Sequence, residues 1–166
     1  MNASGSLTIL GSTGSIGKST LDVVSRHLDK YRIVALTANT DVDALEQQCL
    51  QWQPEYAVMG DQGSAQQLFD RLKARGLDTQ VLAGIEGLKK VSSLDPVDTV
   101  VAGIVGAAGL LPTLSAAESG KRVLLANKEA LVMSGRLFMD AVHNLSLIHI
   151  SEPTRRATIS RMPSSA

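Results

Sequence analysis

Short apolar runs alternate with longer segments of helical period along most of this chain. The runs lie at residues 7–10, 32–37, 56–59, 80–82, 99–102 and 122–126. Strands that alternate with helices form parallel sheets, because parallel neighbours need a crossover connection. Helices cover both faces of such a sheet, and this explains why the runs are apolar almost throughout. The sequence therefore predicts an α/β fold with a doubly wound parallel sheet.

Helices are expected between these runs, where apolar residues recur three or four positions apart. They are placed at residues 16–28, 42–52, about 68–76, 85–91, 111–119 and 129–142. The expected buried face of the first helix holds Ile16, Thr20, Val23, Val24 and His27. The third helix is marked by Leu68, Phe69 and Leu72, and Pro54 closes the second because proline cannot continue a helix.

Residues 11–17, with the sequence GSTGSIG, lie between the first expected strand and the first expected helix. Glycines let the backbone turn sharply and approach a pyrophosphate, and free N–H groups at a helix start attract its negative charge. Ser12, Thr13 and Ser15 add hydroxyl donors. The alternative is a glycine-rich turn that serves close packing only. The strand–turn–helix context favours a Rossmann-like dinucleotide-binding domain.

Residues 38–41 follow the second expected strand, where the adenosine ribose of a dinucleotide would lie. They include no arginine or lysine, the residues that a 2′-phosphate prefers. Asp41 either hydrogen-bonds ribose hydroxyls or caps the next helix, and capping is the favoured role. These residues alone do not separate NAD from NADP.

Two further segments follow expected strands at the same edge. Residues 103–109 (GIVGAAG) are small enough for a nicotinamide to lie close to the backbone, or they serve tight strand–helix packing. Asn127, Lys128 and Glu129 come directly after the last apolar run. They offer groups for a phosphorylated or hydroxylated substrate, or form a helix cap followed by two solvated charges.

Composition excludes several classes of partner. Lys+Arg and Asp+Glu number 16 each, and aromatic residues make up 3%, so neither a basic surface nor stacking platforms favour nucleic acid. The apolar run at residues 7–10 is too short for a signal peptide or a membrane span. Cys49 has no internal disulfide partner, and we expect a packed or capping role for it, as for His27, rather than a catalytic one. The sequence predicts a cytoplasmic protein.

The pattern changes after Asn144. Residues 145–155 (LSLIHISEPTR) back-translate to a string that resembles the end of a transposon-based sequencing-library adapter, and residues 160–166 (SRMPSSA) to its flow-cell end. The four residues between them leave room for an index. We therefore expect one domain over residues 1–144 and a non-native, disordered tail over residues 145–166.

Three motifs together carry a family resemblance. GSTGSIG at 11–17, GIVGAAGLLPT at 103–113 and LLANKEALV at 124–132 occur in this order. With them, the stretch from Leu7 to Asn144 resembles the N-terminal NADPH-binding domain of 1-deoxy-D-xylulose-5-phosphate reductoisomerases. The first motif is shared with other reductases, whereas ANKE together with GIVGAAGL is far more specific.

The resemblance implies an oxidoreductase and isomerase of non-mevalonate isoprenoid biosynthesis. The full-length enzyme would be a homodimer that converts 1-deoxy-D-xylulose 5-phosphate to 2-C-methyl-D-erythritol 4-phosphate with NADPH and Mg²⁺ or Mn²⁺. The residues implied for the cofactor are Thr13, Gly14, Ser15, Ile16, Asn39, Asn127 and Glu129, and Lys128 is implied for the substrate. The family's metal ligands lie beyond Asn144, so we expect no catalytic or metal-binding residue in this chain and no turnover by it alone.

One departure from the family pattern concerns the adenosine phosphate. Where the family often has glycine, a basic residue and asparagine, this chain has Asn39, Thr40 and Asp41. Two other functions stay open: another NAD(P)-dependent reductase, such as a semialdehyde dehydrogenase with a cysteine nucleophile, and a non-catalytic nucleotide-sensing domain. Cys49, in an early helix, argues against the first, and Lys128 argues mildly against the second.

Overall fold

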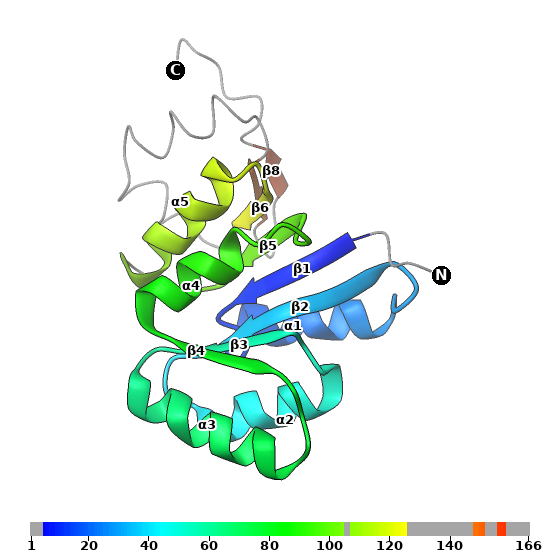
Figure 1. Ribbon diagram of the computed structural model, residues 1–166. Helices are drawn as coiled ribbons and strands as arrows, with labels where there is room; N and C mark the ends of the chain where they lie inside the picture. Colours follow the sequence, from blue (N-terminus) through cyan, green and yellow to red (C-terminus); the bar gives the residue numbers. More distant parts are fainter. Residues whose placement is uncertain (1–4, 105–106, 126–147, 152–155, 159–166) are drawn as a thin grey trace.

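The computed structural model describes residues 5–104, 107–125, 148–151 and 156–158 (Figure 1). The strands are β1 (Gly5–Leu10), β2 (Tyr31–Thr37), β3 (Tyr56–Met59), β4 (Gln80–Ala83), β5 (Thr99–Ala102), β6 (Arg122–Leu125), β7 (Ile148–Ser151) and β8 (Arg156–Thr158). The helices are α1 (Ser15–Ser25), α2 (Val42–Trp52), α3 (Gln62–Ala74), α4 (Gly84–Ser92) and α5 (Leu110–Glu118), with the 3-10 helix η1 (Ala107–Gly109) before α5.

All the described strands belong to one sheet with the order β4-β3-β2-β1-β5-β6-β7-β8. Neighbours from β4 to β7 pair in parallel, and β7 pairs with β8 in the antiparallel sense. The chain builds outward from β1 to β4 and then returns to the other side of β1 with β5. The strand order therefore reverses between β1 and β5, as in doubly wound sheets. The predicted fold class is confirmed.

The core consists of two apolar layers, one on each face of the sheet. Alternation along β1 separates them: Leu7 and Ile9 belong to one layer and Leu10 to the other. Helices α1, α2 and α3 cover the first layer with Leu21, Val24, Leu45, Cys49, Leu68 and Leu72. Helices α4 and α5 cover the second layer with Val91, Ala116 and Ala117. In Figure 1 these two groups of helices lie on opposite sides of the strands.

Capping residues set the ends of α2 and α3. Asp41 accepts a hydrogen bond from the backbone N–H of Ala44, and Asp61 accepts one from that of Ser64. The bond from Ser64 also lowers the pKa of the Asp61 carboxyl below its ordinary value. Helix α2 ends at Gln53, whose backbone is left-handed with φ 47°, directly before Pro54. The predicted closure of this helix at Pro54 is confirmed.

Three residues expected on buried helix faces are exposed. Val23 is 53% exposed and Phe69 is 42% exposed. His27 is also exposed, because it lies beyond the end of α1. The buried face of α1 is instead formed by Gly17, Leu21 and Val24, and Val23 lies about 100° round the helix from Val24. The error arises because two adjacent apolar residues cannot both face a flat sheet, and spacing alone does not decide between them.

Strands β7 and β8 lie within residues 145–166, the segment that the sequence analysis assigns to a non-native tail. The outer edge of β6 offers backbone N–H and C=O groups that no other described strand would pair. Backbone pairing depends little on side-chain identity, so a short extended segment can occupy such an edge. The helix expected at 129–142 lies outside the described residues.

Candidate functional site

A crevice of about 350 Å³ opens at the carboxyl ends of β1, β2, β3 and β5. It is lined by Gly11, Thr13, Gly14, Thr37, Ala38, Asn39, Gly60, Leu88, Gly103, Ile104 and Ala108. These residues come from the turn after β1, the ends of β2 and β3, helix α4 and the segment after β5. The crevice therefore lies at the point where the strand order reverses, which is where doubly wound sheets bind ligands.

Gly11 and Gly103 bring the ends of β1 and β5 into close contact. Gly11 has φ +74°, a left-handed conformation that favours glycine, and a Cβ on it would lie 2.9 Å from the Gly103 carbonyl oxygen. A Cβ on Gly103 would lie 2.7 Å from the carbonyl oxygen of Leu10, which accepts a hydrogen bond from the Gly103 N–H at 2.9 Å. Side chains at either position would push the two strand ends apart.

Gly17 serves close packing. A Cβ on this residue would lie 2.4 Å from both the Gly11 carbonyl oxygen and the Cα of Ser12, and neither backbone atom can move aside cheaply. Helix α1 can therefore approach the turn that precedes it only with glycine here. Of the two roles that the sequence left open for the glycines of the GSTGSIG motif, close packing is therefore the role of Gly17.

Gly14 has a different environment. It is exposed, its φ of −80° suits any residue, and an added Cβ would meet only the Gly11 carbonyl oxygen, at 3.5 Å. It is the N-cap of α1, and it provides no side-chain cap. The first helical turn holds no acidic residue, and its N–H groups lack partners within the helix. Gly14 therefore leaves space for an anion at the positive end of the helix.

The hydroxyl of Ser12 does not face the crevice, which corrects its expected role as a ligand donor. Ser12 is fully buried, and its Oγ lies 2.6 Å from Gln48 Oε1 and 3.0 Å from the Thr37 carbonyl oxygen. Thr13 lines the crevice, and Ser15 is exposed at the start of α1. Ile16 is half-buried and packs toward Gly103, where an added Cβ would lie 3.6 Å from its side chain.

Asn39 lies where the second strand ends, as predicted, and it lines the crevice. Its carbonyl oxygen accepts a hydrogen bond from the Gly60 N–H at 2.8 Å, and its Oδ1 occupies the place of a Cβ on Gly60. The favoured role of Asp41 is confirmed, because its carboxylate caps α2. Among the crevice residues that the structure describes, none carries a charge.

Sequence reasoning missed Thr37, Gly60 and Leu88 as crevice residues. Gly60 directly follows β3, so its place at the same sheet edge was available from the strand pattern. Leu88 comes from α4, and no local sequence signal points to it. The predicted residues Asn127, Lys128 and Glu129 lie outside the described part of the chain.

Cys49 is not among the residues that line the crevice, where a cysteine nucleophile would have to lie. Its side chain is buried beneath α2, and burial, with the nearby Glu46 carboxylate, raises the pKa of the thiol to about 12. A thiol with this pKa stays protonated at neutral pH and is a poor nucleophile. This environment argues against the semialdehyde dehydrogenase alternative.

Within residues 5–104, 107–125, 148–151 and 156–158, no three His, Cys, Asp or Glu side chains gather into a possible metal site. Among the helices that the structure describes, none combines the length and the apolar character needed to cross a bilayer.

The parallel sheet, its switch point and the glycine-lined crevice define a Rossmann-like α/β protein. Sequence comparison then narrows this class. A family model described as 1-deoxy-D-xylulose 5-phosphate reductoisomerase matches residues 7–135. The chain belongs to this family.

Relatives of the chain carry the same family name. The 1-deoxy-D-xylulose 5-phosphate reductoisomerase of Nitrosomonas europaea is 62% identical over 146 residues, which are 87% of this chain and 35% of the relative. That of Tolumonas auensis is 58% identical over 140 residues, 84% of this chain and 35% of the relative. The chain thus spans about a third of the length of the curated relatives it matches.

Solved structures agree with the sequence comparison. A DOX-P reductoisomerase in complex with NADPH, fosmidomycin and magnesium superposes with a TM-score of 0.84 at 46% identity, over 89% of this chain and 36% of that one. The enzyme from Zymomonas mobilis in complex with NADPH gives 0.81 at 38% identity, over 89% of this chain and 38% of that one. The described fold is therefore that of a region of these enzymes.

Proposed function

We propose that this chain is the NADPH-binding domain of a 1-deoxy-D-xylulose 5-phosphate reductoisomerase. The observation that carries the proposal is the open backbone at Gly14, at the start of α1 and beside the switch-point crevice. A helix start without acidic side chains suits a pyrophosphate, and a glycine whose added Cβ would make only one ordinary contact leaves room for it. Family membership and NADPH complexes of related structures support the same cofactor.

Different residues of this chain would contact different parts of the cofactor. Thr13, Gly14, Ser15 and Ile16 would hold the pyrophosphate and its ribose through backbone N–H groups and hydroxyls. Asn39 would contact the adenosine end by its amide. Asn127 and Glu129 would contact the cofactor, and Lys128 the phosphorylated sugar substrate. NADPH supplies the hydride, whereas these residues bind and orient it.

The reaction of the complete enzyme is part of the same proposal. It would rearrange 1-deoxy-D-xylulose 5-phosphate and reduce the product to 2-C-methyl-D-erythritol 4-phosphate in the cytoplasm, as a homodimer with Mg²⁺ or Mn²⁺. Magnesium complexes of related structures support the metal. Because this chain corresponds to about a third of its relatives, we infer that it does not perform the reaction alone. Metal-dependent NADPH oxidation by this chain would contradict that inference.

Titration of NADPH into the chain and its Gly14→Val variant tests the cofactor site. A valine side chain would occupy the space that the pyrophosphate needs, so affinity should fall at least about tenfold, which corresponds to about 1.4 kcal/mol. The matched control is Gly63→Val, in the first turn of α3 and outside the crevice residues. Circular dichroism must show that all three proteins are folded. Equal NADPH affinity for wild type and Gly14→Val would overturn the proposed site.

We also propose that the domain ends near Asn144 and that residues 145–166 are a non-native tail. The support is the adapter-like sequence of that segment, together with the family match, which ends at residue 135. A segment that was not selected to pack contributes little to stability, even where it pairs with a sheet edge. Deleting residues 145–166 should therefore leave the thermal midpoint unchanged. A drop of several degrees would show that β7 and β8 stabilise the sheet, and it would contradict this proposal.

A further inference from the structure

The side chain of Gln48, in the middle of α2, bonds to the turn that follows β1. Its Nε2 donates to the Ser12 carbonyl oxygen at 2.9 Å, and its Oε1 lies 2.6 Å from Ser12 Oγ. Both groups of the carboxamide are thus used on one residue, 36 positions away in sequence. Gln48 does not line the crevice. We therefore expect Gln48 to affect a ligand in the crevice through its contact with Ser12.

The chemistry of the contact fixes which way the carboxamide points. If the amide were reversed, its oxygen would face the Ser12 carbonyl oxygen, and two acceptors would repel each other. The hydroxyl of Ser12 has one proton, which it donates either to Gln48 Oε1 or to the Thr37 carbonyl oxygen. Ser12 is fully buried, so loss of its bonds to Gln48 leaves buried polar groups without this partner.

The turn is held from a second side by β2. The Ser12 N–H donates to the Thr37 carbonyl oxygen at 2.8 Å, and the Gly11 N–H donates to Thr37 Oγ1 at 2.8 Å. Gln48 is itself fixed, because Leu45 and Cys49, its neighbours on α2, are fully buried. The turn is thus clamped between the end of β2 and the side of α2, two residues before Gly14.

We propose that Gln48 is a positioning residue for the phosphate-binding turn and that it acts through Ser12. The proposal rests on the proposed function. Anion binding at a helix start depends on the direction of a few N–H groups, and a displacement of less than an ångström weakens such bonds. Gln48 holds the backbone at Ser12, and the backbone at Ser12 sets the direction of the N–H groups from Gly14 onward.

The test compares Gln48→Ala with Gln47→Ala, a matched control because Gln47 is exposed on the same helix. NADPH affinity should fall about five- to tenfold in Gln48→Ala and stay unchanged in Gln47→Ala. Gln48→Glu should weaken binding further, because a carboxylate oxygen in the place of Nε2 would face the Ser12 carbonyl oxygen and repel it. Ser12→Ala removes only the bond between Ser12 Oγ and Gln48 Oε1 and keeps the Ser12 carbonyl oxygen that Gln48 Nε2 bonds, so it should weaken NADPH binding less than Gln48→Ala does.

Amide hydrogen exchange without NADPH provides an independent reading. In Gln48→Ala, the amides of Ser12 and Gly14 should exchange at least about fivefold faster, while those of β3 stay unchanged. Equal exchange and equal NADPH affinity in Gln48→Ala and wild type would overturn the positioning role and leave the proposed function intact. If the wild-type chain binds no NADPH, the proposed function is overturned. Faster exchange in Gln48→Ala than in wild type would then still show that Gln48 holds the turn.

Discussion

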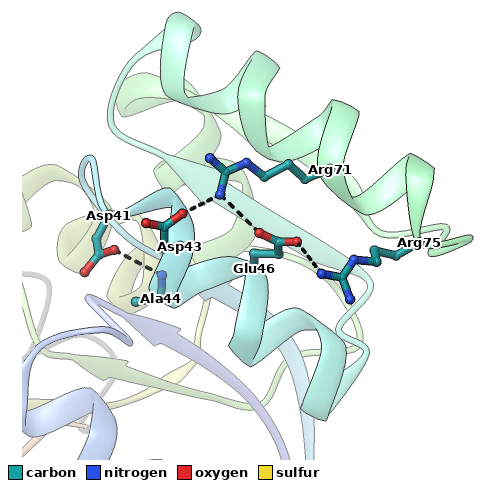
Figure 2. A network of polar contacts seen from close by, with 6 residues as sticks. All are labelled: Asp41, Asp43, Ala44, Glu46, Arg71 and Arg75. Carbon is teal, nitrogen blue, oxygen red and sulfur yellow. Dashed lines mark hydrogen bonds and ion pairs between the residues drawn. The ribbon is translucent and has the colours of Figure 1, made fainter.

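Helix α2 is held by polar side chains on two sides, and the two sides differ in their exposure to solvent. On the inner side, a half-buried Gln48 contacts the fully buried Ser12 through neutral hydrogen bonds. On the outer side, Glu46 lies between Arg71 at 3.1 Å and Arg75 at 3.6 Å, as Figure 2 shows. The inner contacts hold a turn, whereas the outer contacts join α2 to α3.

The outer junction combines one buried charge with exposed partners. The Glu46 side chain is 9% exposed, while the side chains of Arg71 and Arg75 are 41% and 55% exposed. Arg71 also pairs with Asp43, and hydrogen bonds to Asp43 and then to Glu46 raise the pKa of its guanidinium. Solvent screens such pairs and allows them to rearrange. The outer side therefore joins two helices through a half-exposed ionic network, whereas the inner side holds the backbone of the turn after β1.

Gly17→Ala should have the largest effect on stability, because it forces a Cβ onto backbone atoms of the turn. Overpacking of this kind costs up to about 3 kcal/mol, and alanine recovers about 1 kcal/mol through its helix propensity. We expect a loss of about 2 kcal/mol in urea unfolding. Gly14→Ala is the control, and its loss should stay below about 1 kcal/mol because only an N-cap preference changes. Equal losses would show that the two glycines do not differ.

Cys49 lies between the two sides of α2, and its thiol makes the free energy of unfolding depend on pH in the alkaline range. Its pKa is raised from 9.0 to about 12 in the folded chain, so the unfolded chain releases the thiol proton first. The contribution of this residue to stability is therefore complete below about pH 9 and falls as pH rises toward 12, by at most about 1.4 kcal/mol per pH unit. Cys49→Ala should show a shallower decline over this range in urea unfolding. Parallel curves for the two proteins would contradict the raised pKa.

Glu46→Gln should reduce stability by about 1 kcal/mol, because a buried carboxylate that joins two arginines becomes neutral. NADPH affinity should not change, since this side of α2 does not hold the turn. Asp43→Asn serves as the control: its side chain is 86% exposed, and we expect no measurable loss of stability. Weaker NADPH binding in Glu46→Gln would mean that the two sides are coupled.

The α/β order and most element positions were predictable because buried parallel strands are apolar throughout and need little context. The capping role of Asp41 was also predictable, since a cap depends on nearby residues only. The exposure of Val23 and Phe69 was not predictable, because the sheet determines which apolar residue of a helix is covered. The pairing of β7 with β6 has no signal in the sequence, because an open sheet edge accepts a segment through its backbone.

The crevice was partly predictable for the same physical reasons. The turn with Gly14 and the end of β2 at Asn39 follow from the strand pattern, because carboxyl ends of parallel strands share one edge. The contact between Gln48 and Ser12 spans 36 residues and has no local signature. A sequence pattern also suggested a ligand role for the Ser12 hydroxyl, and only packing against α2 shows that it points inward.

Titration of NADPH into the isotopically labelled chain, followed by amide chemical shifts, tests the central claim most directly. The account predicts that the largest changes occur at the amides of Thr13, Gly14, Ser15 and Ile16, with smaller changes at Asn39. These shifts should saturate together, since one dinucleotide contacts both segments. Unchanged amides in the turn at saturating NADPH, with shifts confined to other parts of the chain, would contradict the claim that this turn binds the cofactor.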